Sequence, residues 1–209
     1  MTRNPLRRAG AIASIAVALS LTLAACGEDD STSTASGDTA SSEETSMAED
    51  NAGADTFGEG CKLIPADGAG SFNGMATAPV ATAASANPLL KTLVTAVGEA
   101  GLVDTLNSAE ALTVFAPTDD AFAKIPSETL NGLLADKKAL TTVLTHHVVA
   151  GQLSPDEVAG THETLAGDKI TVEGSGEEFT VTGADAKVLC GNIPTANATV
   201  YVIDTVLVP

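Results

Sequence analysis

Three arginines, a run of mostly apolar residues and a cysteine open the chain. The apolar run covers residues 9–25, no acidic residue precedes Cys26, and the basic residues ahead of the run are Arg3, Arg7 and Arg8. A basic segment followed by an apolar segment is the layout of a secretory signal. A membrane-spanning helix needs roughly 20 apolar residues, which is more than this run supplies. We therefore interpret residues 1–25 as a cleaved export signal and not as a transmembrane anchor, so that the remaining chain folds outside the cytoplasm.

The end of this run predicts a lipid modification. Leu23-Ala24-Ala25-Cys26 resembles the lipobox of bacterial lipoproteins, in which small residues precede a cysteine whose thiol receives the lipid. A diacylglyceryl group on Cys26 carries two acyl chains, which hold a protein on a bilayer far better than one chain does. Removing residues 1–25 changes the net charge from −17 to −20, so attraction to anionic lipids does not assist the anchor. We expect attachment through Cys26 to the outer face of the cell membrane, at the cell surface, with a fraction released.

Residues 26–60 are rich in Ser, Thr and acidic residues, and large apolar side chains are nearly absent. Such a segment cannot bury enough apolar surface to offset the entropy lost on ordering. We predict a flexible tether, which at roughly 5–6 Å × √n spans on average about 30 Å. Ser/Thr-rich spacers are also sites of O-glycosylation, and the sequence leaves open whether this one is a plain linker or carries sugars.

The two other cysteines predict a disulfide. With Cys26 lipidated, Cys61 and Cys190 form an even remainder in an exported chain, which favours a bond between them. The bond would close a loop of about 130 residues. The alternative is a pair of buried free thiols. No Cys-x-x-Cys motif occurs, so a thiol-based redox enzyme is disfavoured.

Residues 61–209 show no internal repeat, and we expect them to form one folded domain. Hydrophobic spacing predicts a helix from Asn87-Pro88 to Gly101, a helix over 127–134 and a third after Asp136. Alternating apolar residues predict a hairpin over 170–181 with its turn at 174–177. The remaining predicted strands are 112–115, 187–190 and 199–203. Helices thus precede most strands, which favours an α+β fold.

No group of side chains in the sequence indicates catalysis. His147 follows Leu140 at helical spacing together with Leu144, so we interpret it as a core histidine that binds the backbone. His146 would diverge from it by about 100° on a helix, which makes a poor pair of metal ligands. Asp119-Asp120 suits a helix N-terminus better than a cation site, and no Gly-x-Ser-x-Gly elbow occurs. We expect no catalytic residue, no metal and no cofactor, and therefore no enzyme.

Three stretches resemble the fasciclin domain. Residues 113–122 (TVFAPTDDAF) and 198–209 (ATVYVIDTVLVP) are similar to its two signatures, and 144–151 (LTHHVVAG) lies where the family has its central histidine. The resemblance implies a β-sandwich wedge of about seven strands with helices packed along one side. It also implies an adhesion or ligand-binding role without known catalysis. The cysteine pair and the lipobox resemble the mycobacterial cell-surface lipoprotein antigens of this family.

Two departures from the family pattern bear on the partner. Animal members are thought to adhere partly through a Tyr-His pair and an Asp-Ile pair, but this chain has His146-His147 and Asn192-Ile193 there. The carboxylate that would complete an integrin's metal site is therefore missing, and these residues are not expected to be ligands.

The sequence as a whole predicts a non-catalytic, monomeric adhesion or binding module for extracellular matrix, a host receptor or an envelope component. Its contact with the membrane would be made through the lipid on Cys26. The net charge of −17 and an aromatic content of 3% disfavour nucleic acid as a partner. The alternative is a carrier or sensor of a small apolar ligand, such as a lipid, at the junction of helices and sheet.

Overall fold

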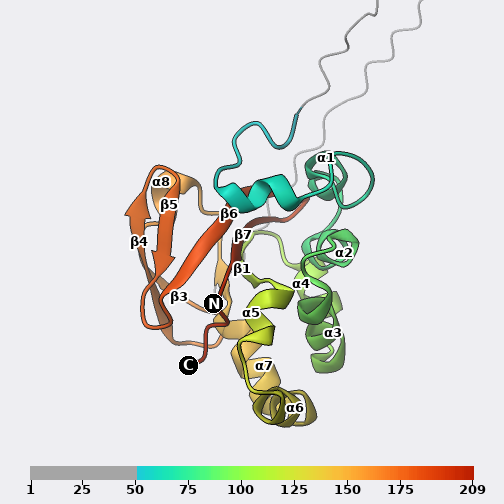
Figure 1. The fold of residues 1–209 in the computed structure, drawn as a ribbon, viewed down its shortest axis with the longest axis vertical. Coiled ribbons are helices and arrows are strands. Elements are labelled where there is room, and N and C mark those ends of the chain that lie inside the picture. The colour runs from blue at the N-terminus through green and yellow to red at the C-terminus, as the bar shows by residue number, and fades with distance from the viewer. Residues whose placement is uncertain (1–50) are drawn as a thin grey trace, which may run out of the picture. The chain divides into compact units, whose positions relative to one another are not determined.

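The computed structural model describes residues 51–209 (Figure 1). The predicted export signal, Cys26 and the tether up to residue 50 lie outside the described residues. The helices are η1 (Glu59–Leu63), α1 (Phe72–Ala76), α2 (Val80–Ala86), α3 (Lys91–Ala100), α4 (Val103–Ser108), α5 (Asp119–Ala123), α6 (Ser127–Ala135), α7 (Lys137–His146) and α8 (Pro155–Val158). The strands are β1 (Leu112–Pro117), β2 (Val148–Ala150), β3 (Gly160–Glu163), β4 (Lys169–Ser175), β5 (Glu178–Val181), β6 (Ala186–Pro194) and β7 (Ala198–Ile203). Within this described range, every helix is too short or too polar to cross a membrane.

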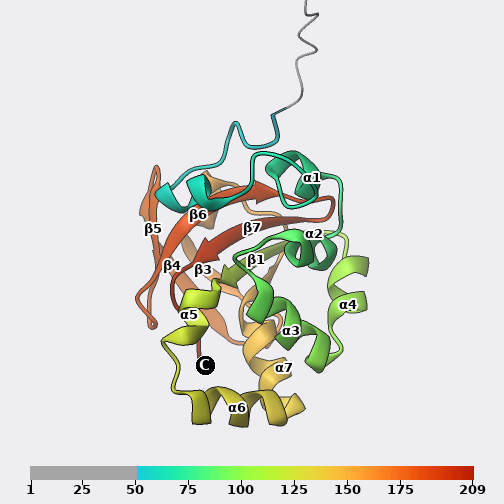
Figure 2. The same ribbon diagram turned by 45° about the vertical axis from the view of Figure 1, so that its right-hand side comes forward.

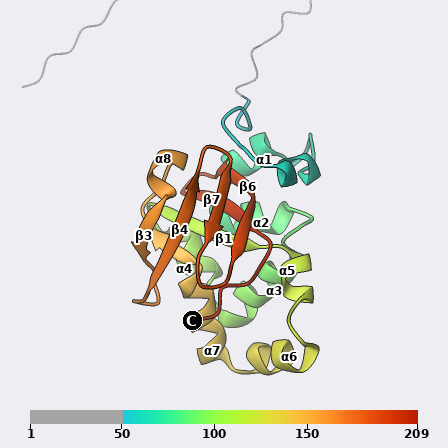
Figure 3. The ribbon, with the colours of Figure 1, turned by 60° about the vertical axis from the view of Figure 1, so that its left-hand side comes forward.

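The seven strands form one curled sheet in the order β2-β1-β7-β6-β5-β4-β3 (Figure 3). β1 and β7 run parallel, and the other neighbouring strands pair antiparallel. The long strand β6 bends at two register shifts, so that it pairs with β5 at one end and with β7 along the rest. A backbone bridge between Val149 and Thr164 links the β2 edge to the end of β3. The expected seven strands are thus confirmed, and the sheet nearly closes on itself.

The helices α2 to α5 and α7 lie on one side of this sheet, as expected, and α6 packs against α7 (Figures 1 and 2). Neighbouring residues on a strand point to opposite faces, and all six residues of β1 are buried. Phe115 faces the interior of the curled sheet, while Val114 and Ala116 face the helices. The domain therefore has two cores that share the central strands. The interior core consists of Phe57, Phe115, Val149, Val158, Ile170, Val172, Phe179, Val181, Ala186, Val188, Tyr201, Ile203 and Leu207.

The predicted start of α3 was wrong, although its end at Gly101 is confirmed by a left-handed φ of 70°. The helix begins at Lys91 and not at Asn87-Pro88. The Asn87 side chain is buried and accepts a hydrogen bond from the Leu89 N–H. The first turn of α3 is capped from elsewhere, because the Asp119 carboxylate accepts a 2.7 Å hydrogen bond from the Thr92 N–H.

The folded part extends before Cys61, where the sequence prediction began it. Phe57 is 8% exposed, and its ring lies 5.3 Å from that of Phe179 and 6.2 Å from that of Tyr201. Its backbone exchanges hydrogen bonds with Gly191, where a Cβ atom would lie 2.2 Å from the Phe57 ring. A single aromatic residue in a polar stretch has no periodicity, so the sequence alone placed it in the tether.

Candidate functional site

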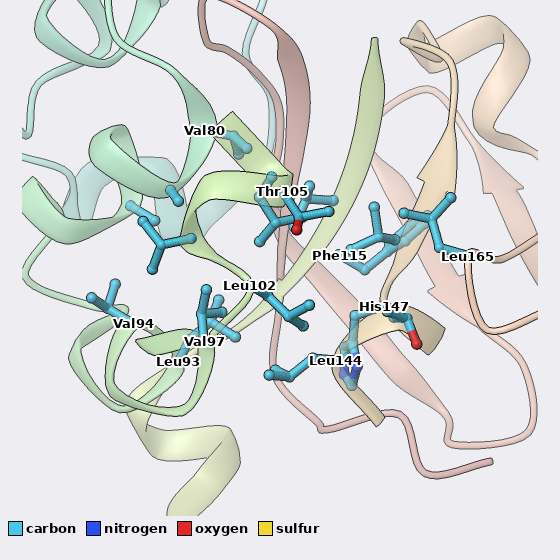
Figure 4. A pocket seen from close by; sticks show the side chains of 17 residues that line it. Val80, Leu93, Val94, Val97, Leu102, Thr105, Phe115, Leu144, His147 and Leu165 are labelled. Atoms are coloured by element: carbon cyan, nitrogen blue, oxygen red, sulfur yellow. The ribbon is translucent and has the colours of Figure 1, made fainter. Parts of the chain in front are cut away.

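An apolar pocket lies between the helices and the sheet (Figure 4). Its cavity volume is about 70 Å³. Side chains of α3, including Val94 and Val97, lie on one side, and Phe115 and Leu165 lie on the other (Figure 4). Of the described residues that line it, none is charged, and the polar ones are Thr105, Thr145 and His147.

Local sequence patterns bring these walls together. Leu93 and Val97 stand four positions apart on α3 and therefore share a face. Gly101 ends that helix in a left-handed conformation, which allows the chain to reverse so that Leu102 and α4 return to the pocket. Leu144 contributes from the last turn of α7.

The deeper polar groups of the lining already have partners within the domain. His147 is 2% exposed, its Nδ1 lies 2.7 Å from the Val143 carbonyl oxygen, and its Nε2 accepts a hydrogen bond from the Leu207 N–H at 2.9 Å. Because an N–H points at Nε2, the proton of the neutral ring must be on Nδ1, which donates to Val143. The Thr145 hydroxyl donates to the Thr141 carbonyl at 2.8 Å.

The surroundings of His147 keep its ring neutral. Burial lowers the pKa of His147 from 6.5 to about 4, the Val143 hydrogen bond opposes this shift, and nearby His146 adds to it. Protonation of Nε2 would also break the hydrogen bond from Leu207. The structure therefore places His147 in the core, where it joins the end of α7 to the C-terminal segment.

His146 faces a different direction from its neighbour, with the two rings perpendicular and 6.3 Å apart. Its Nδ1 lies 2.7 Å from an Asp168 carboxylate oxygen, although the ring N–H is not well aligned with that oxygen. The contact is therefore a close polar contact between the ring and the carboxylate, not an aligned hydrogen bond. The Thr164 hydroxyl donates to the other carboxylate oxygen and is the main cause of the lowered pKa of Asp168. These contacts hold the turn that carries Leu165 against the end of α7.

The disulfide expected between Cys61 and Cys190 is present, with 4.8 Å between the two Cα atoms. It joins η1 to β6. The other expected modification site, Cys26, lies outside the described residues.

Asp119 and the pair Asn192-Ile193 have structural roles in the domain. Thr118 caps α5, and Asp119 caps α3. Ile193 is 1% exposed, and the Asn192 side chain donates to the Asp55 carbonyl at 3.0 Å. In the range 51–209, His, Cys, Asp and Glu side chains form no group of three or more that could hold a metal.

A second hollow, of about 880 Å³, lies between η1 and the β4–β5 hairpin. Its lining includes five acidic side chains and Lys187; the acidic ones are Glu59, Glu173, Glu177, Glu178 and Asp185. This charge disfavours anionic ligands there.

Sequence comparison relates the chain to known proteins. A sequence model of the fasciclin domain matches residues 88–209. The chain is 50% identical over 164 residues to the cell surface glycolipoprotein MPB83 of Mycobacterium bovis, covering 75% of this chain and 73% of that protein. It is 49% identical over 166 residues to the immunogenic protein MPB70 of the same species, covering 76% and 84%. A solved FAS1 domain pair from the insect cell adhesion molecule fasciclin I matches with a TM-score of 0.47 and 21% identity, over 57% of this chain and 45% of that one.

Proposed function

The chain belongs to the fasciclin domain family, and from that premise we propose that it is a lipid-anchored cell-surface protein whose domain binds an extracellular macromolecule without catalysing a reaction. The observation that carries this proposal is the 50% identity to a protein named as a cell surface glycolipoprotein. The basic and apolar leader over residues 1–25, followed by Cys26, supports the same location independently.

Three side chains of reactive types are held in structural roles and are consistent with a domain that binds without catalysis. Both ring nitrogens of His147 are engaged with backbone groups. A general base must be free to reach a substrate proton, and His147 is not. The Cys61 and Cys190 thiols are joined to each other, so neither is a nucleophile.

The charge of the domain limits its partners. Residues 51–209 contain nineteen acidic and seven basic residues, a net charge of −12. A partner with a basic surface would therefore be favoured over an acidic one, and salt would weaken the association. Matrix proteins, a host receptor and envelope components are the classes that an exported, surface-held domain would meet.

The binding proposal is tested with the purified mature protein on immobilised matrix proteins, glycans and envelope extract. We expect saturable binding in the micromolar range that weakens several-fold as salt rises from about 0.05 to 0.5 M. A peptide of residues 27–50, which carries eight acidic residues, is the control for nonspecific charge effects and should not bind. Absence of saturable binding to any of these surfaces at about 10 μM would reject this role.

The anchoring proposal is tested by Cys26→Ala. Without the thiol no lipid can be attached, so the variant should leave the membrane fraction for the medium or remain unprocessed. Cell fractionation followed by immunoblotting measures this distribution. Thr32→Ala in the tether is the matched control and should stay on the membrane. Unchanged membrane retention of Cys26→Ala would disprove lipidation at this residue.

A further inference from the structure

We propose that the apolar pocket between the helices and the sheet takes the end of one uncharged hydrocarbon chain, which enters between Val103 and Leu165. This site differs from a surface for macromolecules, so the inference stands or falls independently of the adhesive role.

The mouth of the pocket is apolar. Large apolar side chains are exposed at four described positions, which are Leu63, Val103, Leu165 and Val208. Two of them, Val103 at 38% exposure and Leu165 at 46%, line this pocket. They come from α4 and from the turn between β3 and β4, so two segments that are distant in sequence each contribute an exposed apolar group to the lining of this pocket. A hydrocarbon chain passing between them would remove their apolar surface from water, which is favourable.

The pocket interior offers apolar contacts and few free hydrogen-bonding groups. Both nitrogens of His147 are bonded to backbone groups, and the Thr145 hydroxyl donates within α7. The remaining polar side chain of the lining is Thr105, which is exposed on α4. A polar or charged head group deep inside would lose its water with at most this one hydroxyl as a partner, which is unfavourable. The head group of a ligand must therefore stay outside the mouth.

The size of the cavity limits the shape of the ligand. A volume of about 70 Å³ is less than half of the roughly 150 Å³ cavity that holds a benzene ring. A slender chain end fits this space, whereas a fused ring system or a pair of chains does not. α4 has no buried residue, so it is the wall that would move at least cost to admit more of a chain.

Charge near the mouth selects against anionic head groups. Asp104 follows Val103 on α4, and Glu163 stands two residues before Leu165. Both are exposed, and the described domain is acidic overall with a net charge of −12. Lys169 lies opposite Glu163 in the β3–β4 ladder, so the repulsion of a carboxylate outside the mouth rests mainly on Asp104 and on the net charge of the domain. An alcohol or ester would meet no such repulsion.

The test compares two ligands of equal chain length, 1-decanol and decanoate, by native mass spectrometry and calorimetry on the mature protein at pH 7.5. We expect a one-to-one complex with 1-decanol and at least tenfold weaker binding of decanoate. Failure to bind 1-decanol up to its solubility, or equal binding of decanoate, would overturn the proposal. Adsorption to vesicles of uncharged phospholipid without 1-decanol binding would overturn it as well, because it would indicate a membrane-contact surface.

Substitutions at the mouth locate the site. Leu165→Glu and Val103→Glu alter exposed side chains, so the unliganded protein should keep its melting temperature, but each should weaken 1-decanol binding about tenfold. Leu63→Glu changes a more exposed leucine outside this pocket and should leave binding within twofold of the unmodified protein. Equal losses in all three variants would contradict the assigned entrance.

Discussion

Reduction of the Cys61–Cys190 disulfide is expected to lower the melting temperature of the protein by about 10 °C. The bond joins residues 129 positions apart. The loop-entropy model predicts that such a bond raises the free energy of unfolding by about 5 kcal/mol, and removing a native disulfide typically costs roughly 2–5 kcal/mol. In a domain of this size 1 kcal/mol shifts the melting temperature by about 2–4 °C. The bridge also holds η1 beside β6, next to the segment that inserts Phe57 into the interior core.

Thermal unfolding followed by circular dichroism, with and without reductant, measures this effect. The Cys61→Ser/Cys190→Ser double variant should melt near the temperature of the reduced protein and should not respond to reductant, which controls for direct effects of the reagent. A shift below about 2 °C on verified reduction would show that the bridge contributes little to the free energy of unfolding.

His147→Ala is expected to reduce the free energy of unfolding by about 3–5 kcal/mol. The substitution removes the acceptor of the Leu207 N–H and the donor to the Val143 carbonyl. A buried polar group left without its partner costs about 1–3 kcal/mol, and a cavity in a well-packed core adds to this. Equilibrium urea unfolding measures the change.

His162→Ala is the matched control for this variant. His162 is half-buried and makes one described hydrogen bond, from Nε2 to the Val158 carbonyl oxygen at 2.9 Å. Its loss should cost about 1 kcal/mol. If His147→Ala unfolded with a free energy close to that of the control but lost binding to the partner surface, His147 would have a functional role and not a structural one.

The same histidine makes stability depend on pH. The pKa of His147 is lowered to about 4 in the folded protein, from 6.5. Between these values His147 binds a proton in the unfolded chain but not in the folded protein. Its contribution to the free energy of unfolding is therefore complete above about pH 6.5 and is lost as the pH falls toward 4. The loss is on the order of 3 kcal/mol. In His147→Ala this part of the pH dependence should disappear, leaving the contribution of carboxylates such as Asp168, whose lowered pKa acts in the same direction.

Local patterns were sufficient to predict much of the fold. Asp119 and Asp120 lie at the N-terminus of α5, and Asp136 caps α7, as the sequence indicates for both positions. The strand expected at 112–115, which extends to Pro117 in β1, and the hairpin of β4 and β5 were also predictable, because alternation and turn residues depend on neighbours in sequence. The helical spacing of His147 from Leu140 likewise predicts burial, and both side chains are buried.

Features that depend on distant segments could not be predicted in this way. The cap of α3 comes from Asp119, and Phe57 has neighbours at Phe179 and Tyr201. The pocket itself has no sequence signature, because Val103 and Leu165 come to line the same pocket only after the chain has folded. An isolated apolar residue beside an acidic one could have indicated Val103 and Leu165 in the sequence, but exposed apolar residues are common on protein surfaces.

The mass of the N-terminal peptide of the protein extracted from the membrane fraction tests the central claim of surface anchoring most directly. We predict a peptide that begins at Cys26 and carries the added mass of a diacylglyceryl group, with residues 1–25 absent. Intact polypeptide with residues 1–25 still attached and an unmodified Cys26, recovered from the cytosol, would contradict the account.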